Sequence, residues 1–188
     1  RHVYRELTRT RIAANSGLSF SSNIARIAAS VRGTIERLPR SDDLDWHYEV
    51  PANCNVAIDE DDAVELLANL LDNSRKWARA EVILSAVRAA DIVAISIEDD
   101  GPGVPHDNFA SILKRGMRLD ESVPGSGLGL TIVKDLVDAY GGEVEFYRAA
   151  AGGLGVRVSL PAASTGPLEP AGQAPGIERH QAGNGAAV

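Results

Sequence analysis

The sequence predicts an α+β sandwich, in which helices cover one face of a mixed, mostly antiparallel sheet. Apolar residues recur at helical spacing over residues 24–38, 65–78 and 131–140. Short apolar or alternating runs typical of strands occupy residues 46–50, 55–58, 82–87, 92–97, 143–147 and 156–160. Short turns join most strand neighbours, which favours antiparallel pairing.

The expected helix boundaries follow from local chemistry. Ser21 or Ser22 could cap the first helix of the domain, and Pro39 ends it. The acidic run at residues 59–62 suits the start of a long helix that ends near Ala78, because the helix dipole favours negative charge there. Gly141 and its glycine neighbour close the last helix.

Three regions are expected along the chain. Residues 1–20 read as a weak helix and a linker, residues 21–162 as one folded domain, and residues 163–188 as a disordered tail with few large apolar side chains. Residues 106–124, between the strands and the last helix, are expected to be irregular. Because the chain starts without Met in helix-like sequence, we expect it to be a fragment of a longer protein.

Composition excludes some classes of function. The 188 residues carry a net charge of −7, which argues against broad nucleic-acid binding, although a local basic spot for a small polyphosphate remains possible. The single cysteine, Cys54, permits no intrachain disulfide and is expected to be a small buried side chain. No apolar run reaches the length of a membrane span, and we expect no signal peptide in this sequence.

A polar stripe follows the long helix. Glu65, Asn69 and Asn73 are each four residues apart, and Lys76 follows three later, so all four lie along one side. A solvated face would explain such a stripe, but Asn is a poor helix former and is an unusual choice there. Side-chain amide oxygens at this spacing suit a Mg²⁺ ion that keeps waters and phosphates among its ligands. Both interpretations stay open on the helix alone.

The turn after the second central strand is the next candidate. Asp99 ends an apolar strand and leads into Gly101 and Gly103. Glycine lets a ligand approach the backbone, and a carboxylate at the bottom of an apolar pocket can accept a hydrogen bond from the exocyclic amine of adenine. An ordinary Asp-Gly turn is the alternative.

A glycine loop precedes the last helix. Gly125, Gly127 and Gly129 occupy alternate positions and lead directly into it. Backbone N–H groups at a helix N-terminus form an anion site, whereas a flexible linker would need no such helix. The spacing matches neither the dinucleotide fingerprint nor the P-loop.

Together the ordered patterns N-x-x-x-N-x-x-K, D-x-G-x-G and G-x-G-x-G-L resemble the N, G1 and G2 boxes of the histidine-kinase catalytic domain. That domain belongs to the ATPase superfamily that includes Hsp90, gyrase B and MutL. The resemblance covers residues 22–162, and among sensor kinases it is most similar to the PhoQ type. It implies the Bergerat-type ATP-binding fold, an α/β sandwich with three helices on one face of the sheet.

The resemblance implies roles for the polar stripe. Asn73 would coordinate Mg²⁺, with Asn69 assisting at the metal or phosphates. Glu65 aligns with the acidic residue that orients water or acts as a base. Lys76 would contact phosphate, and Trp77 takes a position usually held by Tyr, His or Phe, where the ring lies against adenine.

The resemblance also implies a nucleotide pocket and a lid. Asp99 would bind the adenine amine. The remaining nucleotide-binding residues that it implies are Gly101, Gly103, Val104, Arg115, Arg118, Gly125, Gly127, Leu128, Gly129 and Leu130. Residues 105–126 would form an ATP lid, from which Arg115 is expected to reach the γ-phosphate, although a solvated surface arginine is the alternative. The family usually carries Phe near Leu113, and Phe109 is the nearest aromatic residue here.

The phosphoacceptor histidine of such a kinase is not found. The four histidines are His2, His47, His106 and His180, and none lies in a motif like H-E-L-R-T-P. The resemblance implies a cytoplasmic domain of an inner-membrane sensor that is a homodimer at full length. It would use ATP and Mg²⁺ and act with a dimerisation and histidine-phosphotransfer domain and a response regulator receiver domain. A conformational ATPase or a non-catalytic nucleotide-binding module is the alternative.

Overall fold

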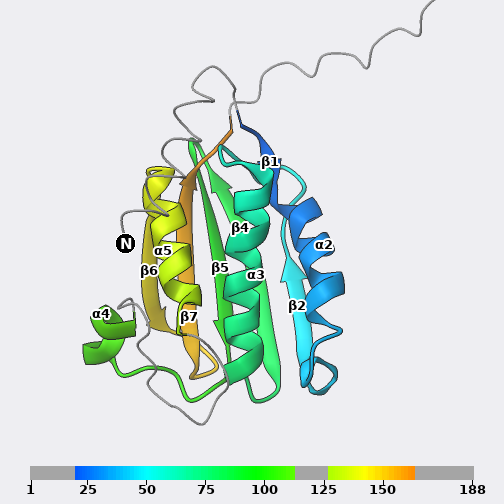
Figure 1. Ribbon diagram of the computed structural model, residues 1–188, viewed down its shortest axis with the longest axis vertical. Coiled ribbons are helices and arrows are strands. Elements are labelled where there is room, and N and C mark those ends of the chain that lie inside the picture. The colour runs from blue at the N-terminus through cyan, green and yellow to red at the C-terminus, as the bar shows by residue number, and fades with distance from the viewer. Residues whose placement is uncertain (1–19, 113–126, 164–188) are drawn as a thin grey trace, which may run out of the picture.

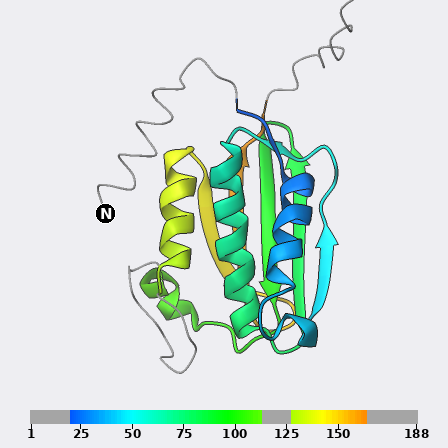
Figure 2. The same ribbon diagram turned by 45° about the vertical axis from the view of Figure 1, so that its right-hand side comes forward.

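The computed structural model describes residues 20–112 and 127–163. They form two layers, with three helices lying across one face of a five-stranded sheet (Figures 1 and 2). The predicted sandwich is therefore confirmed. Residues 1–19, 113–126 and 164–188, which include the expected N-terminal helix, most of the expected lid and the expected tail, lie outside the described residues.

The sheet has the strand order β2-β4-β5-β7-β6. Its strands are β2 (Asp45–Glu49), β4 (Glu81–Ala89), β5 (Ile92–Asp99), β6 (Glu143–Arg148) and β7 (Leu154–Pro161). All pairs are antiparallel except β2 with β4, which are parallel. The exception follows from connectivity, because a helix rather than a tight turn separates these two strands in the chain.

The long helix α3 (Glu60–Trp77) is the central one of the three. The side chain of Asp59 caps it by accepting a hydrogen bond from the Asp61 backbone N–H at 3.0 Å. Its first turn is acidic and its last turn is basic, as the helix dipole favours. The leucines of α3 are fully buried against the sheet, which leaves the opposite side for the polar stripe.

The first helix, α2 (Ile24–Ile35), starts differently from the prediction. Its cap is Asn23, whose side chain accepts from the Arg26 backbone N–H at 2.9 Å. Ser22 instead lies in the short strand β1 (Ser22–Asn23), which pairs with β3 (Asn55–Val56), and its hydroxyl donates to the Ile58 carbonyl at 2.7 Å. The helix ends at Ile35, three residues before the last apolar position predicted for it.

The third helix, α5 (Gly129–Ala139), begins within the glycine loop. Residues 106–112 are helical rather than irregular, as the short helices η2 (His106–Asn108) and α4 (Phe109–Ile112). A further short helix, η1 (Ser41–Asp43), follows α2. Within the described residues, no helix is long and apolar enough to cross a membrane.

Candidate functional site

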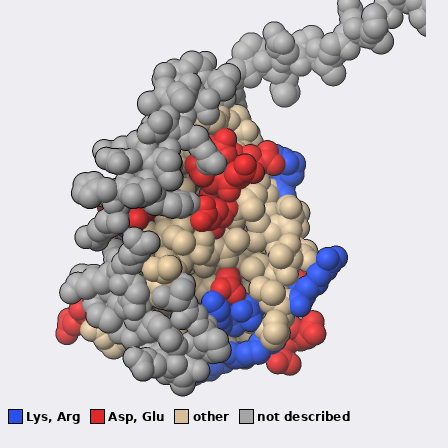
Figure 3. Space-filling view, viewed as in Figure 1, with Lys and Arg blue, Asp and Glu red and all other residues tan. Residues whose placement is uncertain are grey.

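The three candidate motifs meet at one end of the sandwich, the lower end in Figure 1. The last turns of α3, the end of β5 and the first turn of α5 all lie there. Figure 3 shows basic side chains near this end and acidic side chains gathered toward the other. This matches the acidic first turn and the basic last turn of α3. A local basic spot therefore exists in a chain of net charge −7.

Asn69 faces the start of α5. Its Nδ2 donates to the Glu65 backbone carbonyl at 2.8 Å, which leaves Oδ1 for another partner. A Cβ added to Gly129 would stand 3.2 Å from that Oδ1. The polar stripe and the glycine loop, 60 positions apart in the chain, are thus in direct contact.

Asn73 lies one turn further along α3 and is half-buried. No hydrogen bond joins its side chain to another described residue. With Asn69 it could supply amide oxygens to a hard cation. The described part of the chain contains no group of three or more His, Cys, Asp or Glu that could hold a metal ion. A Mg²⁺ ion here would therefore depend on the amides, on water and on phosphate oxygens. Glu65, two turns earlier, is also half-buried.

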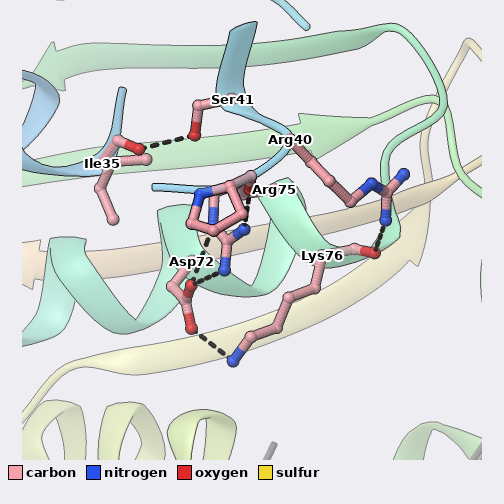
Figure 4. A network of polar contacts seen from close by, with 7 residues as sticks. Ile35, Arg40, Ser41, Asp72, Arg75 and Lys76 are labelled. Carbon is pink, nitrogen blue, oxygen red and sulfur yellow. Dashed lines mark hydrogen bonds and ion pairs between the residues drawn. The ribbon is translucent and has the colours of Figure 1, made fainter. Parts of the chain in front are cut away.

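The side chain of Lys76 is held by an ion pair within its own helix. Its Nζ forms an ion pair with Asp72 Oδ2 at 2.5 Å, and Figure 4 shows the Lys76 side chain extended along the helix toward that carboxylate. Trp77 ends the helix, with its ring half-buried. Its backbone carbonyl lies against the turn that follows β5.

Asp99 is the most constrained polar residue of the site, with only 3% of its surface exposed. Its Oδ1 accepts hydrogen bonds from the backbone N–H groups of Gly101, at 2.9 Å, and Leu154, at 3.2 Å. Its Oδ2 is buried and has no hydrogen-bond partner among the residues that the structure describes. Burial raises the pKa of this carboxyl against the two hydrogen bonds, and the charge of Asp100 raises it further. A buried acceptor without a donor is costly, so Oδ2 is the atom that a ligand's N–H would satisfy.

The turn after Asp99 is packed too tightly for side chains. A Cβ on Gly101 would overlap the Trp77 carbonyl oxygen and stand 2.8 Å from Asp99 Oδ1. Gly103 has a φ of 70°, and a Cβ there would lie 3.0 Å from the Gly152 carbonyl oxygen. Both glycines are therefore required by the geometry, as the D-x-G-x-G pattern predicts.

Asp100 holds the same turn to the end of α3. Its Oδ1 accepts from the backbone N–H of Arg79 at 2.7 Å and of Ala80 at 3.0 Å. Burial raises the pKa of this carboxyl, but backbone donors, Ala80 foremost, outweigh that effect and lower it. Asp100 is thus a structural acid, and the neighbouring Asp99 keeps an oxygen available for a ligand.

The hairpin turn between β6 and β7 forms a wall that sequence reasoning missed. Leu154 donates to Asp99 as described above, and a Cβ on Gly153 would overlap the Asp99 carbonyl oxygen and Oδ1. The signal in the sequence was the adjacent glycine pair at Gly152 and Gly153. Gly152 has a φ of 99°, which only glycine adopts readily.

Apolar and glycine residues complete the described part of the site. Val104 and Leu130 are half-buried and pack against the main core. Leu128 is half-buried and directly precedes α5, and Gly127 has a φ of 66°. Helix α5 thus begins close to Asn69, and the backbone N–H groups that open a helix can bind an anion.

Three predicted residues, Arg115, Arg118 and Gly125, lie outside the described residues. The aromatic residue closest to the family's Phe position is described. The ring of Phe109 lies 6.2 Å from that of Phe146 on β6, centroid to centroid, and 5.3 Å from that of His106. The first turns after the Asp99 loop are thus packed on the edge of the sheet.

A separate cavity of about 210 Å³ is lined by Glu81, Ile83, Glu98, Asp99, Ala150 and Ala151. It lies on the sheet face that the helices leave uncovered, because Ile83 and Glu98 alternate along their strands with buried residues of the helix-covered face. This cavity therefore lies on the opposite face of the sheet from α3 and its polar stripe.

Residues 58–164 match the family of histidine kinase-, DNA gyrase B-, and HSP90-like ATPases. The chain belongs to this family. It is 36% identical over 162 residues to the sensor protein kinase CarS of Pseudomonas aeruginosa, an alignment that covers 86% of this chain and 36% of CarS. It is 26% identical over 153 residues to the two-component sensor PhoQ of the same organism, which covers 81% of this chain and 34% of PhoQ.

The solved structure of the mycobacterial sensor histidine kinase MprB has the same fold, with a TM-score of 0.69 at 25% identity. The alignment covers 78% of this chain and 100% of that one. The predicted ATP-binding domain, its Bergerat-type fold and its likeness to PhoQ-type sensors are therefore confirmed. The chain spans about a third of the length of CarS and PhoQ.

Proposed function

We propose that this ATPase-family domain binds Mg-ATP between α3 and α5 and is the catalytic domain of a two-component sensor histidine kinase. It would transfer the γ-phosphoryl group to a histidine outside the 188 residues, for relay to a response regulator receiver domain. The observation that carries the proposal is the buried, unpartnered Oδ2 of Asp99, at the same end of the sandwich as the Asn69 contact with Gly129.

The described residues of the site then take the following roles in nucleotide binding. Asp99 Oδ2 accepts a hydrogen bond from the exocyclic amine of adenine, while Oδ1 stays fixed by the backbone N–H groups of Gly101 and Leu154. The backbone N–H groups that open α5 bind phosphate oxygens. A bound Mg²⁺ would neutralise phosphate charge, and Asn69 and Asn73 would hold it.

The reaction needs further groups. Glu65, on the same stripe, would orient the attacking group or accept its proton. Arg115 is proposed to support the γ-phosphate, and Arg118 is a further proposed nucleotide-binding residue. Trp77, Val104 and Leu130 would border the adenine ring.

The histidines that the structure describes do not suit the phosphoacceptor. His47 Nε2 lies 3.2 Å from Glu81 Oε1 on the uncovered face of the sheet, and His106 packs against Phe109. We therefore propose that the phosphoacceptor belongs to a dimerisation and histidine-phosphotransfer domain of the same kinase, a homodimer at full length. The domain would be a cytoplasmic part of an inner-membrane sensor.

The test is nucleotide titration by calorimetry, with and without Mg²⁺. Wild type should bind ATP in preference to GTP. Asp99→Asn should lose that preference, because an amide cannot replace the second carboxylate acceptor, and Asn73→Ala should lose the dependence of affinity on Mg²⁺. If both variants bind ATP like wild type, the proposed site is wrong.

A second measurement separates the kinase from a nucleotide-dependent conformational ATPase. The isolated chain is expected to form no stable phosphohistidine with labelled ATP. It should phosphorylate a supplied phosphotransfer domain of a PhoQ-type sensor. Phosphohistidine on the isolated chain, or steady ATP hydrolysis with no transfer to the supplied domain, would contradict the proposal.

A further inference from the structure

Asp72 joins two cations at the end of α3 where the site lies (Figure 4). Its Oδ1 accepts from Arg75 Nε at 3.1 Å and from Arg75 Nη2 at 2.7 Å, and its Oδ2 pairs with Lys76 Nζ at 2.5 Å. Asp72 is thus the shared partner of two neighbouring basic side chains.

The Arg75 half of this arrangement is fixed. The side chain of Arg75 is only 11% exposed, and its Nη1 also donates to the Pro39 backbone carbonyl, in the loop after α2. Arg75 therefore holds the Asp72 carboxylate from one side through two donors while the loop holds Arg75. Both N–H groups donate to the same oxygen, Oδ1, and charge-assisted hydrogen bonds of this kind are stronger than neutral ones.

The Lys76 half is held by Asp72 alone among the described residues. Because Asp72 precedes Lys76 by four residues, the lysine side chain reaches back one turn along the helix. The ion pair therefore holds the ammonium group about one turn earlier along α3, at Asp72, the residue before Asn73. An ammonium group has three donors, so the pair with Asp72 leaves capacity for an anion.

Arg40 adds a third cation without using the carboxylate. Its Nη1 donates to the Lys76 carbonyl at 2.9 Å and its Nη2 to the Ala78 carbonyl at 3.2 Å, so it caps the end of α3. Asp72 thus pairs with two of these three cations. Burial raises the pKa of Asp72, but the hydrogen bonds from Lys76 and Arg75 outweigh burial and lower it, so the carboxylate stays charged at neutral pH.

We propose that Asp72 is a positioning residue for nucleotide binding: anchored by Arg75, it holds the ammonium group of Lys76 beside the Asn69–Asn73 stripe, ready to contact the phosphate chain. The inference rests on the proposed function. Its physical basis is preorganisation, because a long flexible side chain that is already ordered loses less entropy when the anion arrives.

If charge alone mattered, the Asp72→Asn substitution would change the ATP affinity in the opposite direction. Removing a carboxylate near a polyanion site should strengthen binding of ATP, whereas losing the positioning of Lys76 should weaken it. The direction of the change therefore decides between the two.

The experiment is calorimetric titration of Asp72→Asn with Mg-ATP and with adenosine. We expect the affinity for ATP to fall about three- to tenfold, which corresponds to the cost of ordering one long side chain. The affinity for adenosine, which lacks phosphates, should not change. In a Lys76→Met background, Asp72→Asn should cause no further loss.

Asp61→Asn is the matched control, since it removes the same charge from the first turn of α3, at the other end of the helix. It should leave the ATP affinity unchanged. Unchanged or tighter ATP binding by Asp72→Asn, an equal loss for adenosine, or a loss that persists with Lys76→Met would overturn the inference.

Further measurements distinguish a folding defect, a failure of the proposed function and a failure of this inference. If Asp72→Asn does not fold, Asp72→Glu keeps the charge but moves it by one methylene, and it should again lower only the ATP affinity; an unaltered ATP affinity overturns the inference. If wild type binds no ATP, the proposed function itself fails. If Asp99→Asn and Asn73→Ala change nucleotide binding as expected but Asp72→Asn does not, only this inference fails.

Discussion

Gly153 lies so close to Asp99 that an added Cβ would overlap both the carbonyl oxygen and Oδ1 of Asp99. The next residue, Leu154, donates its backbone N–H to the same Oδ1. The β6–β7 turn is therefore part of the adenine pocket proposed above. It fixes one carboxylate oxygen, while the other has no partner among the described residues. This contact makes the turn a sensitive point for stability and for nucleotide affinity together.

Gly153→Ala should lower the free energy of unfolding by about 1–3 kcal/mol, because the methyl group forces backbone or carboxylate to move in a packed region. It should also weaken ATP binding. Gly33→Ala is the matched control: the helical Gly33 has no neighbour within 4 Å of the added Cβ, so the same change should raise the free energy of unfolding by about 0.5–1 kcal/mol. Urea denaturation of both variants tests this, and equal effects would refute it.

Tyr140 joins the end of α5 to the start of α3, away from the nucleotide end. Its hydroxyl donates to Asp62 Oδ2 at 2.6 Å, and Asp62 is only 3% exposed. Burial raises the pKa of Tyr140 and the bond to Asp62 raises it further, so the hydroxyl stays protonated and keeps donating. Tyr140→Phe should therefore cost about 1–3 kcal/mol, since it removes a donor from a buried carboxylate.

Tyr48→Phe is the control for that change. The Tyr48 hydroxyl is buried without a hydrogen-bond partner in the described structure, and burial raises its pKa to about 12. Removing this oxygen should leave the free energy of unfolding unchanged or raise it by up to about 1 kcal/mol. Thermal denaturation of the two variants side by side gives the comparison, and a larger loss for Tyr48→Phe would contradict the assignment.

The predicted elements agree with the structure where periodicity is long and strong. Helix α3 and strands β4 and β5 begin and end within a few residues of the expected positions, because leucine spacing and an acidic first turn are local signals. The start of α2 was assigned to a serine instead of Asn23. The sequence suggested Ser21 or Ser22, but the pairing of β1 with β3, a tertiary contact, places Ser22 in a strand, and Asn23 caps the helix.

In the candidate site, too, local patterns could be predicted from the sequence and tertiary contacts could not. The polar stripe, Asp99 and the glycines follow from spacing and residue type. The role of Gly153 could not be predicted, because it depends on a contact between residues more than 50 positions apart. Asp72 was passed over for another reason: an acid four residues before a lysine usually forms an ordinary surface pair, and only the anchoring of Arg75 on Pro39 sets this one apart.

The raised pKa of Asp99 predicts a pH dependence that is separate from the phosphates. The ionised carboxylate is the better acceptor for the adenine amine, so adenosine affinity should decline on acidification from about pH 7 toward pH 4, starting above the ordinary aspartate pKa of about 3.9. Adenosine is the ligand of choice because it has no phosphate that titrates. Asp99→Asn should bind adenosine weakly and with little pH dependence over this range.

Ionisation of the Asp99 carboxyl favours adenosine binding but lowers the stability of the folded protein. Because the folded-state pKa of Asp99 is raised, its contribution to stability is fully present below the unfolded pKa and is lost as the pH rises through the folded value. At neutral pH, Asp99→Asn should therefore leave the ligand-free protein as stable as wild type or more stable, while weakening adenosine binding. A variant that lost stability at pH 7 together with affinity would show that Asp99 serves the fold rather than the ligand.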